Sequence, residues 1–120
     1  GIDIRGEITH PLLGWKPENP KCNVSRDVIS VTGATFVVRR AIFLKAGGFY
    51  EGYGKGYFED VDFCTRARLK GMKLLVDSQI QVRHDAQRSS RRKLYYLLLH
   101  TQSALRFFTS PIYRQALRQK

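Results

Sequence analysis

Residues 59–71 have the sequence EDVDFCTRARLKG, and this stretch is the clearest helix of the chain. Acidic side chains occupy its first turn and basic side chains its last turn, which is the order of charge that the helix dipole favours. Gly71 follows, and glycine is the commonest residue just past a helix end. We therefore predict a helix over residues 59–70. The loop that leads into it, residues 49–58, is rich in glycine and aromatic residues.

The segments on either side of this helix predict strands and one more helix. Residues 28–38 are rich in β-branched side chains and predict a strand. Residues 39–46 predict a short helix that ends at a glycine pair. Residues 73–76 and 80–83 predict two further short strands. Gly33 interrupts the first strand, and a glycine inside a strand often marks the close approach of another group to the backbone.

The positive charge of the chain is concentrated in its last third. The 120 residues include 21 Lys and Arg against 10 Asp and Glu, a formal charge of +11. Residues 83–120 alone contain nine basic residues and one acidic residue. Hydrophobic residues make up 42% of the chain, which excludes a disordered protein and is enough for one small core. The basic tail indicates an anionic partner.

The tail itself predicts helices. Residues 91–108 form one helical segment, and a second begins after Ser110 as the capping residue and Pro111 as the first helical position. One apolar stripe follows the helical repeat in the first segment: Leu94, Leu97, Leu98, Thr101, Leu105 and Phe108. This stripe fits a helix that packs on the body of the protein. It also fits a helix that lies on an anionic membrane through residues 88–108, and the basic, aromatic composition leaves a nucleic-acid-binding module as a further alternative.

The acidic cluster at the start of residues 59–70 has two interpretations. Glu59 and Asp62 share one face of a helix, and Asp60 points elsewhere. The cluster is either a solvated first turn that the helix dipole stabilises, or a carboxylate at a pocket that acts as a general base. His84, next to Asp85 at the predicted end of a strand, is similarly either a structural histidine or a metal ligand.

Several short motifs occur in a fixed order along the chain. They are VTGA at 31–34, VVRR at 37–40, AGGF at 46–49, FEDVDFC at 58–64, RAR at 66–68, and His84 after a strand. Together they resemble the C-terminal half of family 2 glycosyltransferases, with rhamnosyltransferase-like and galactofuranosyltransferase-like members the most similar. The resemblance covers roughly residues 24–90. It implies an α/β fold of partial GT-A type, in which helices flank a mixed sheet.

The resemblance also implies a division of the chain and a reaction. Residues 1–90 would form the acceptor and metal side of a GT-A domain, and residues 91–120 a basic amphipathic helical tail. Asp60 would be the catalytic base that removes a proton from the acceptor hydroxyl. Glu59 and Asp62 would hold the acceptor, a saccharide or a lipid-linked sugar. The reaction would transfer a sugar from a nucleotide-diphosphate sugar with inversion at the anomeric carbon.

The donor side is implied in less detail. Gly33 and Ala34 match backbone that passes close to the donor sugar, and His84 matches a ligand of a divalent metal, manganese or magnesium. Members of the family begin with a nucleotide-binding half that ends in an Asp-x-Asp motif, and here that pattern occurs only at residues 60–62. We therefore expect metal binding and turnover only together with such a half, so whether the chain acts as an enzyme stays open.

Two further expectations concern partner chains and the location of the protein in the cell. The edge of the sheet that would join a nucleotide-binding half should be covered by a partner chain or by a second copy. The resemblance, together with two cysteines that form no disulfide framework, implies a cytoplasmic protein, with the inner membrane face as the alternative site. A non-catalytic saccharide-binding or interaction remnant is the alternative function.

Overall fold

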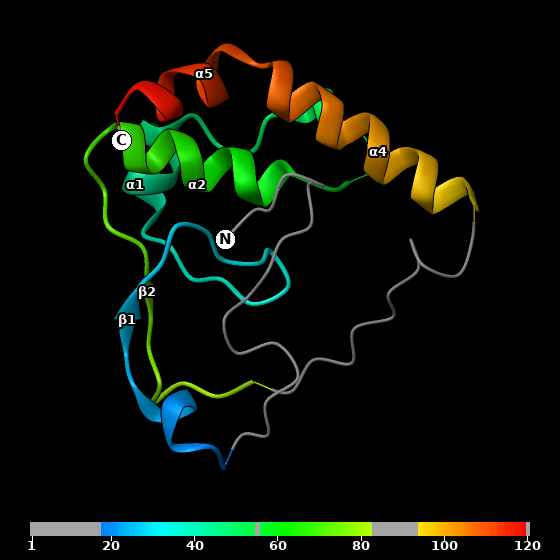
Figure 1. Cartoon of the computed structure of the whole chain (residues 1–120). Coiled ribbons are helices and arrows are strands. Elements are labelled where there is room, and N and C mark those ends of the chain that lie inside the picture. Colours follow the sequence, from blue (N-terminus) through cyan, green and yellow to red (C-terminus); the bar gives the residue numbers. More distant parts are fainter. Residues whose placement is uncertain (1–17, 55, 83–93, 120) are drawn as a thin grey trace.

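Figure 1 shows the computed structural model of the chain, which describes residues 18–54, 56–82 and 94–119. The elements in chain order are η1 (Pro20–Asn23), β1 (Arg26–Asp27), α1 (Arg40–Ala46), η2 (Glu51–Tyr53), α2 (Glu59–Leu69), β2 (Leu75–Val76), α4 (Leu94–Thr109) and α5 (Pro111–Arg118). The helices gather on one side of the molecule, where α5 packs on α2 and on α4 (Figure 1). The pair of strands lies away from them.

The predicted mixed sheet of GT-A type is wrong. In the described part of the chain, the sheet has two strands of two residues each, and the remaining regular structure is helical. The two strands are antiparallel, with Arg26 opposite Val76 and Asp27 opposite Leu75. One further hydrogen bond, from the amide of Val28 to the carbonyl of Leu74 (3.0 Å), extends this pairing. The fold is therefore mostly α-helical.

The predicted strand over residues 28–38 is irregular because its backbone meets a helix and not a second strand. The amide of Val31 donates to the Cys64 thiol (3.5 Å), and that thiol in turn lies 3.9 Å from the Val31 carbonyl. A turn then closes between the amide of Thr35 and the carbonyl of Thr32 (3.3 Å). Of the β-branched side chains that predicted a strand, Val31 and Val38 pack partly buried against the cluster on α2, whereas Ile29 and Val37 are exposed.

The predicted helices are confirmed where the structure describes them. Helix α1 ends at Gly47, whose φ of +92° is the left-handed conformation that favours glycine. Helix α2 matches the predicted residues 59–70. Ser110 caps α5 by accepting a hydrogen bond from the amide of Tyr113 (3.1 Å). Of the two later predicted strands, the first is present as β2, whereas residues 80–82 have no regular structure and residue 83 lies outside the described residues.

Helix α2 is the common wall of two hydrophobic clusters. The first lies between α1 and α2 and is formed by Ala46, Phe63, Cys64 and Ala67, with Phe36 and Phe43 against them. The second lies between α2 and the tail helices and is formed by Tyr53, Phe58, Val61 and Phe107. The rings of Phe58 and Phe107 lie 5.6 Å apart. The position of α4 and α5 therefore depends on the N-terminal half of α2.

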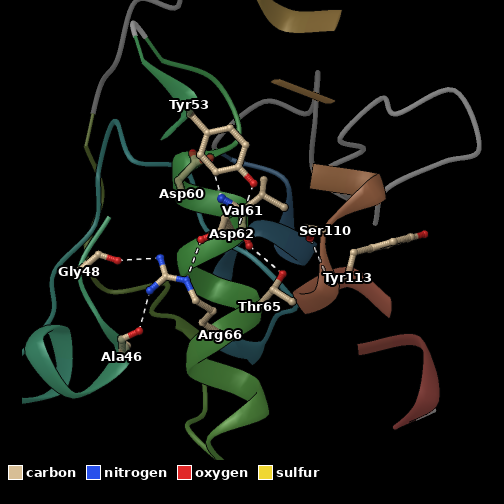
Figure 2. Close-up of polar contacts among 10 residues, drawn as sticks. All are labelled: Ala46, Gly48, Tyr53, Asp60, Val61, Asp62, Thr65, Arg66, Ser110 and Tyr113. Carbon is tan, nitrogen blue, oxygen red and sulfur yellow. Dashed lines mark hydrogen bonds and ion pairs between the residues drawn. The ribbon is translucent and has the colours of Figure 1, made fainter. Parts of the chain in front are cut away.

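One arginine fixes α2 to the end of α1. The guanidinium of Arg66 donates to Asp62 (2.7 Å) and to the carbonyl oxygens of Ala46 and Gly48 (both 2.6 Å), as Figure 2 shows. Asp62 is buried, and the hydroxyl of Tyr53 also donates to it (3.4 Å). Burial, and then the Asp62 carboxylate, raise the pKa of Tyr53, so this hydroxyl keeps its proton.

Helix α4 packs through a different stripe from the one that its leucines predict. Ser103 and Phe107 are its buried residues. Leu94, Leu98 and Leu105 lie on the other side of the helix and are exposed. Among the described helices, none is both long enough and apolar enough to cross a membrane.

We predict that Arg66→Met destabilises the protein by about 3 kcal/mol, because it leaves the buried Asp62 carboxylate without its cation and two carbonyls without a donor. Urea unfolding measures this loss. Arg68→Met, at an exposed position of the same helix, is the control and should change stability by less than about 0.5 kcal/mol. A loss below about 1 kcal/mol for Arg66→Met would contradict the role given to this contact.

Candidate functional site

An open pocket of about 340 Å³ lies where α2 begins. It is bounded by three segments that are distant in sequence: the turn at residues 32–34, the segment 56–60, and one side of α4. The lining residues are Thr32, Gly33, Ala34, Gly56, Tyr57, Phe58, Glu59, Asp60, Tyr96 and His100. Four of the six predicted site residues, Gly33, Ala34, Glu59 and Asp60, therefore share one pocket.

Asp60 is held in place by two backbone amides. The amide of Gly33 donates to Oδ2 (2.8 Å), and the amide of Val61 donates to Oδ1 (2.8 Å). Amide donors stabilise the ionised form of a carboxylate and fix its orientation. A carboxylate has about four lone-pair sites, so each oxygen keeps the capacity to accept another hydrogen bond. Asp60 is partly exposed and can meet a molecule in the pocket.

Glu59 lies beside Asp60 in the pocket wall. Its Oε2 atom is buried and has no hydrogen-bond partner within the described chain. A buried oxygen of this kind is costly to leave without a donor. Helix α2 begins at Glu59, so the helix dipole stabilises its negative charge. The pocket thus contains one carboxylate with two fixed donors and one with an unused oxygen.

Backbone strain shapes the entrance to α2. Tyr57 and Phe58 both have a φ of +70°, although neither is glycine. Such a conformation costs about 1–3 kcal/mol per residue and persists only where the surroundings enforce it. Phe58 is buried in the second hydrophobic cluster, and this burial offsets the strain. The bend directs the backbone of residues 56–59 along the pocket.

Helix α4 completes the pocket with aromatic side chains. The ring of His100 lies edge-on to Tyr57 (5.2 Å between centroids) and to Phe58 (5.4 Å). Tyr96, one turn earlier, lines the same pocket. Ser103 is buried and donates to the carbonyl of Gly56 (3.2 Å), which ties α4 to the glycine-rich segment. Burial lowers the pKa of His100, so its ring is neutral at pH 7 and offers one donor and one acceptor.

Of the other two predicted site residues, the structure describes only Asp62, which does not line this pocket. Asp62 is buried on a different side of α2, where it contacts Arg66 and Tyr53, as Figure 2 shows. This geometry gives it a structural contact, and its role toward an acceptor stays a prediction. His84 lies outside the described residues.

A divalent metal has an incomplete set of ligands in this pocket. Within residues 18–54, 56–82 and 94–119, no three His, Cys, Asp or Glu side chains come close enough together to hold a metal ion. Glu59 and Asp60 supply two carboxylates, and the remaining oxygen ligands of a magnesium or manganese ion would have to come from a substrate. The described residues by themselves do not fit a metal centre.

Tyr96 and His100 are the pocket residues that sequence reasoning missed. A signal for them exists, because Tyr96, His100, Ser103 and Phe107 recur at helical spacing. This stripe is less apolar than the leucine stripe on the same helix. Hydrophobicity alone therefore selects the leucine stripe, although the other stripe of α4 is the one that packs on the body.

Comparison of the chain with protein-family models, with curated proteins and with solved structures gave no match. A function for the chain is therefore inferred from the residues of this pocket.

We predict that His100 titrates below its ordinary pKa of 6.5. Because the folded state resists protonation of this ring, the unfolded state binds more protons below pH 6.5, and the free energy of unfolding decreases as pH falls through the lower pKa of the folded state. Above pH 6.5 His100 contributes no pH dependence. NMR titration of the ring resonances, assigned by their loss in His100→Gln, measures the midpoint. A midpoint at or above 6.5 would contradict the burial of this ring.

Proposed function

We propose that the pocket at the start of α2 binds the acceptor of a glycosyl transfer reaction and that Asp60 is the general base. The observation that carries this proposal is the anchored carboxylate. Asp60 lines a pocket, is oriented by hydrogen bonds from two backbone amides, and has further lone pairs that can accept a hydrogen bond. The adjacent Glu59 lines the same pocket and offers a second carboxylate to a further hydroxyl of the same sugar.

The proposed reaction is a direct displacement at an anomeric carbon. The acceptor hydroxyl loses its proton to Asp60 while its oxygen forms a bond to the anomeric carbon of a nucleotide-diphosphate sugar. The bond between that carbon and the diphosphate oxygen breaks, and the nucleoside diphosphate leaves with the electron pair. The configuration at the carbon is inverted. In a family 2 site a divalent metal would neutralise the diphosphate, and no residue among those described is assigned to it.

The aromatic wall supports a sugar as the ligand. Tyr57 and Tyr96 combine a flat apolar face with a polar hydroxyl, and a sugar ring has the same alternation of C–H faces and hydroxyl edges. The neutral ring of His100 adds one donor and one acceptor. The pocket volume of about 340 Å³ lies at the lower end of the range of small-molecule sites. Saccharide binding without catalysis is the second candidate function, because these groups serve it equally well.

The location of the protein in the cell is part of the same proposal. A reaction with a nucleotide-sugar donor and a lipid-linked acceptor takes place at the cytoplasmic side of a membrane. The sequence is compatible with a reducing compartment, because it has two cysteines, and Cys64 is buried in the core, where burial raises the pKa of its thiol.

We predict that Asp60→Asn lowers the rate of sugar transfer about 100-fold or more, because the asparagine side chain cannot take up the proton of the acceptor hydroxyl. Acceptor binding should change less than the rate, because the asparagine oxygen can still accept from the Gly33 N–H, although its NH2 group cannot accept from the Val61 N–H. Because turnover is expected only together with a nucleotide-binding half, the assay incubates the full chain with such a half supplied as a separate chain, manganese, a panel of UDP- and dTDP-sugars and saccharide acceptors. It measures the release of nucleoside diphosphate. Isothermal titration with the acceptors alone measures binding.

Glu51→Gln, which removes an exposed carboxylate outside the pocket, is the matched control and should keep the wild-type rate. Equal rates for Asp60→Asn and wild type would contradict the role of Asp60. Saccharide binding without transfer, in every combination of donor and acceptor, would select the non-catalytic candidate. The absence of both binding and transfer would contradict both candidates.

A further inference from the structure

Helix α4 is apolar on two opposite faces. Its inner face contacts the body through Ser103 and Phe107. Its outer face presents Leu94, Leu98 and Leu105, which are 71%, 61% and 62% exposed. Because an α-helix turns about 100° per residue, these leucines lie roughly opposite Ser103. A helix at the surface of a protein in water normally has polar residues on its outer face, so this stripe needs a covering partner.

The charges around the stripe identify the kind of partner. The sequence contains no acidic residue after Asp85. Four basic residues directly precede α4 in the sequence, at positions 88 and 91–93, and Arg106 lies within the helix. A leucine stripe flanked only by positive charge is the composition of a helix that lies in the interface of an anionic bilayer.

We infer that the outer face of α4 docks on an anionic lipid surface, with its leucines in the region between headgroups and acyl chains. The helix lies along the membrane, because its inner face stays packed on α2 and α5. Membrane binding has two components, burial of the leucines and attraction of the basic residues to anionic headgroups. The surface is independent of the proposed reaction.

A second copy of the chain fits the outer face of α4 less well than an anionic bilayer does. If two α4 helices packed face to face, the pair would bring together two segments that are both basic, because residues 86–120 contain Lys and Arg but no acidic residue. No acidic residue after Asp85 is available to compensate them, and like charges at an interface disfavour association. An anionic bilayer complements both the apolar and the charged part of the surface.

Docking in this way places the pocket close to the membrane. Tyr96 and His100 reach the pocket from the inner side of the helix whose outer side faces the lipid. The thickness of one helix, about 10 Å, would separate the two. A lipid-linked sugar anchored in the same bilayer would therefore be within short reach of the pocket.

The test is co-sedimentation of the full chain with vesicles. One vesicle preparation contains phosphatidylcholine alone, and the other contains about 30% phosphatidylglycerol, each in about 0.05, 0.15 and 0.5 M salt. The test variant is Leu98→Ser with Leu105→Ser. The matched control is Leu44→Ser with Leu75→Ser, which removes two leucines that are 62% and 58% exposed on α1 and β2. Circular dichroism checks the fold of both variants.

We expect the wild type to bind the anionic vesicles, to bind neutral vesicles much more weakly, and to lose affinity as salt increases. The affinity of the test variant for the anionic vesicles should be at least about tenfold lower than that of the wild type. The control should bind like the wild type. The comparison of the two vesicle types requires no variant, so it tests the proposal even if the test variant does not fold.

Three results would overturn the proposal. The first is an absence of wild-type binding to the anionic vesicles. The second is binding that decreases with salt but is equal in the test variant, which would indicate a general affinity for polyanions such as nucleic acids. The third is a dimer, measured by light scattering, that the test variant converts to a monomer, which would identify a second copy as the occupant. None of these results bears on Asp60, whose test is the transfer reaction.

Discussion

The guanidinium of Arg66 is the contact on which the arrangement of the helices depends. A single side chain neutralises the buried Asp62 and satisfies the carbonyls of Ala46 and Gly48 at the end of α1 (Figure 2). A buried ion pair by itself is a weak source of stability, because desolvation offsets its attraction. Here the same charge also satisfies two backbone acceptors, and it orients α2 relative to α1. Because α2 forms a wall of both hydrophobic clusters, its orientation determines where α4 and α5 pack.

The pocket is a consequence of how α2 begins. Two residues with left-handed backbone, Tyr57 and Phe58, direct the chain into the helix. The burial of the Phe58 ring against Phe107 offsets the strain of this conformation. The amide of Val61 at the start of the helix and the amide of Gly33 on a distant turn then fix Asp60. Ser103 ties α4 to the same loop, and the pocket closes between them. Packing, capping and the carboxylate pair are therefore parts of one local structure.

The sequence predicted the helices well because their signals are local. Charge order and a terminal glycine located α2, and Ser110 with Pro111 located the start of α5. The sheet was predicted wrongly because a run of β-branched residues favours a strand only where a second strand pairs with it, and the sequence does not show that Val31 meets a cysteine thiol on a helix. Of the two interpretations of the leucine stripe, packing on the body was wrong, because the less hydrophobic stripe of α4 packs and the leucines are exposed. Asp60 and Glu59 were recognisable from their spacing, whereas His100 lies on the less apolar stripe of α4, so its local signal is weaker than that of the leucines.

The central claim is that a sugar binds against Asp60. The most direct measurement is an NMR titration of the isotope-labelled full chain with a panel of saccharides. The amides of Gly33 and Val61 donate to Asp60, so their resonances respond to any molecule that contacts this carboxylate. A saccharide bound against Asp60 should shift both resonances, while the amide of Gly71, at the far end of α2, stays unchanged. If no saccharide moves the Gly33 and Val61 amides, or if the shifts occur only in parts of the protein remote from the pocket, the claim is contradicted.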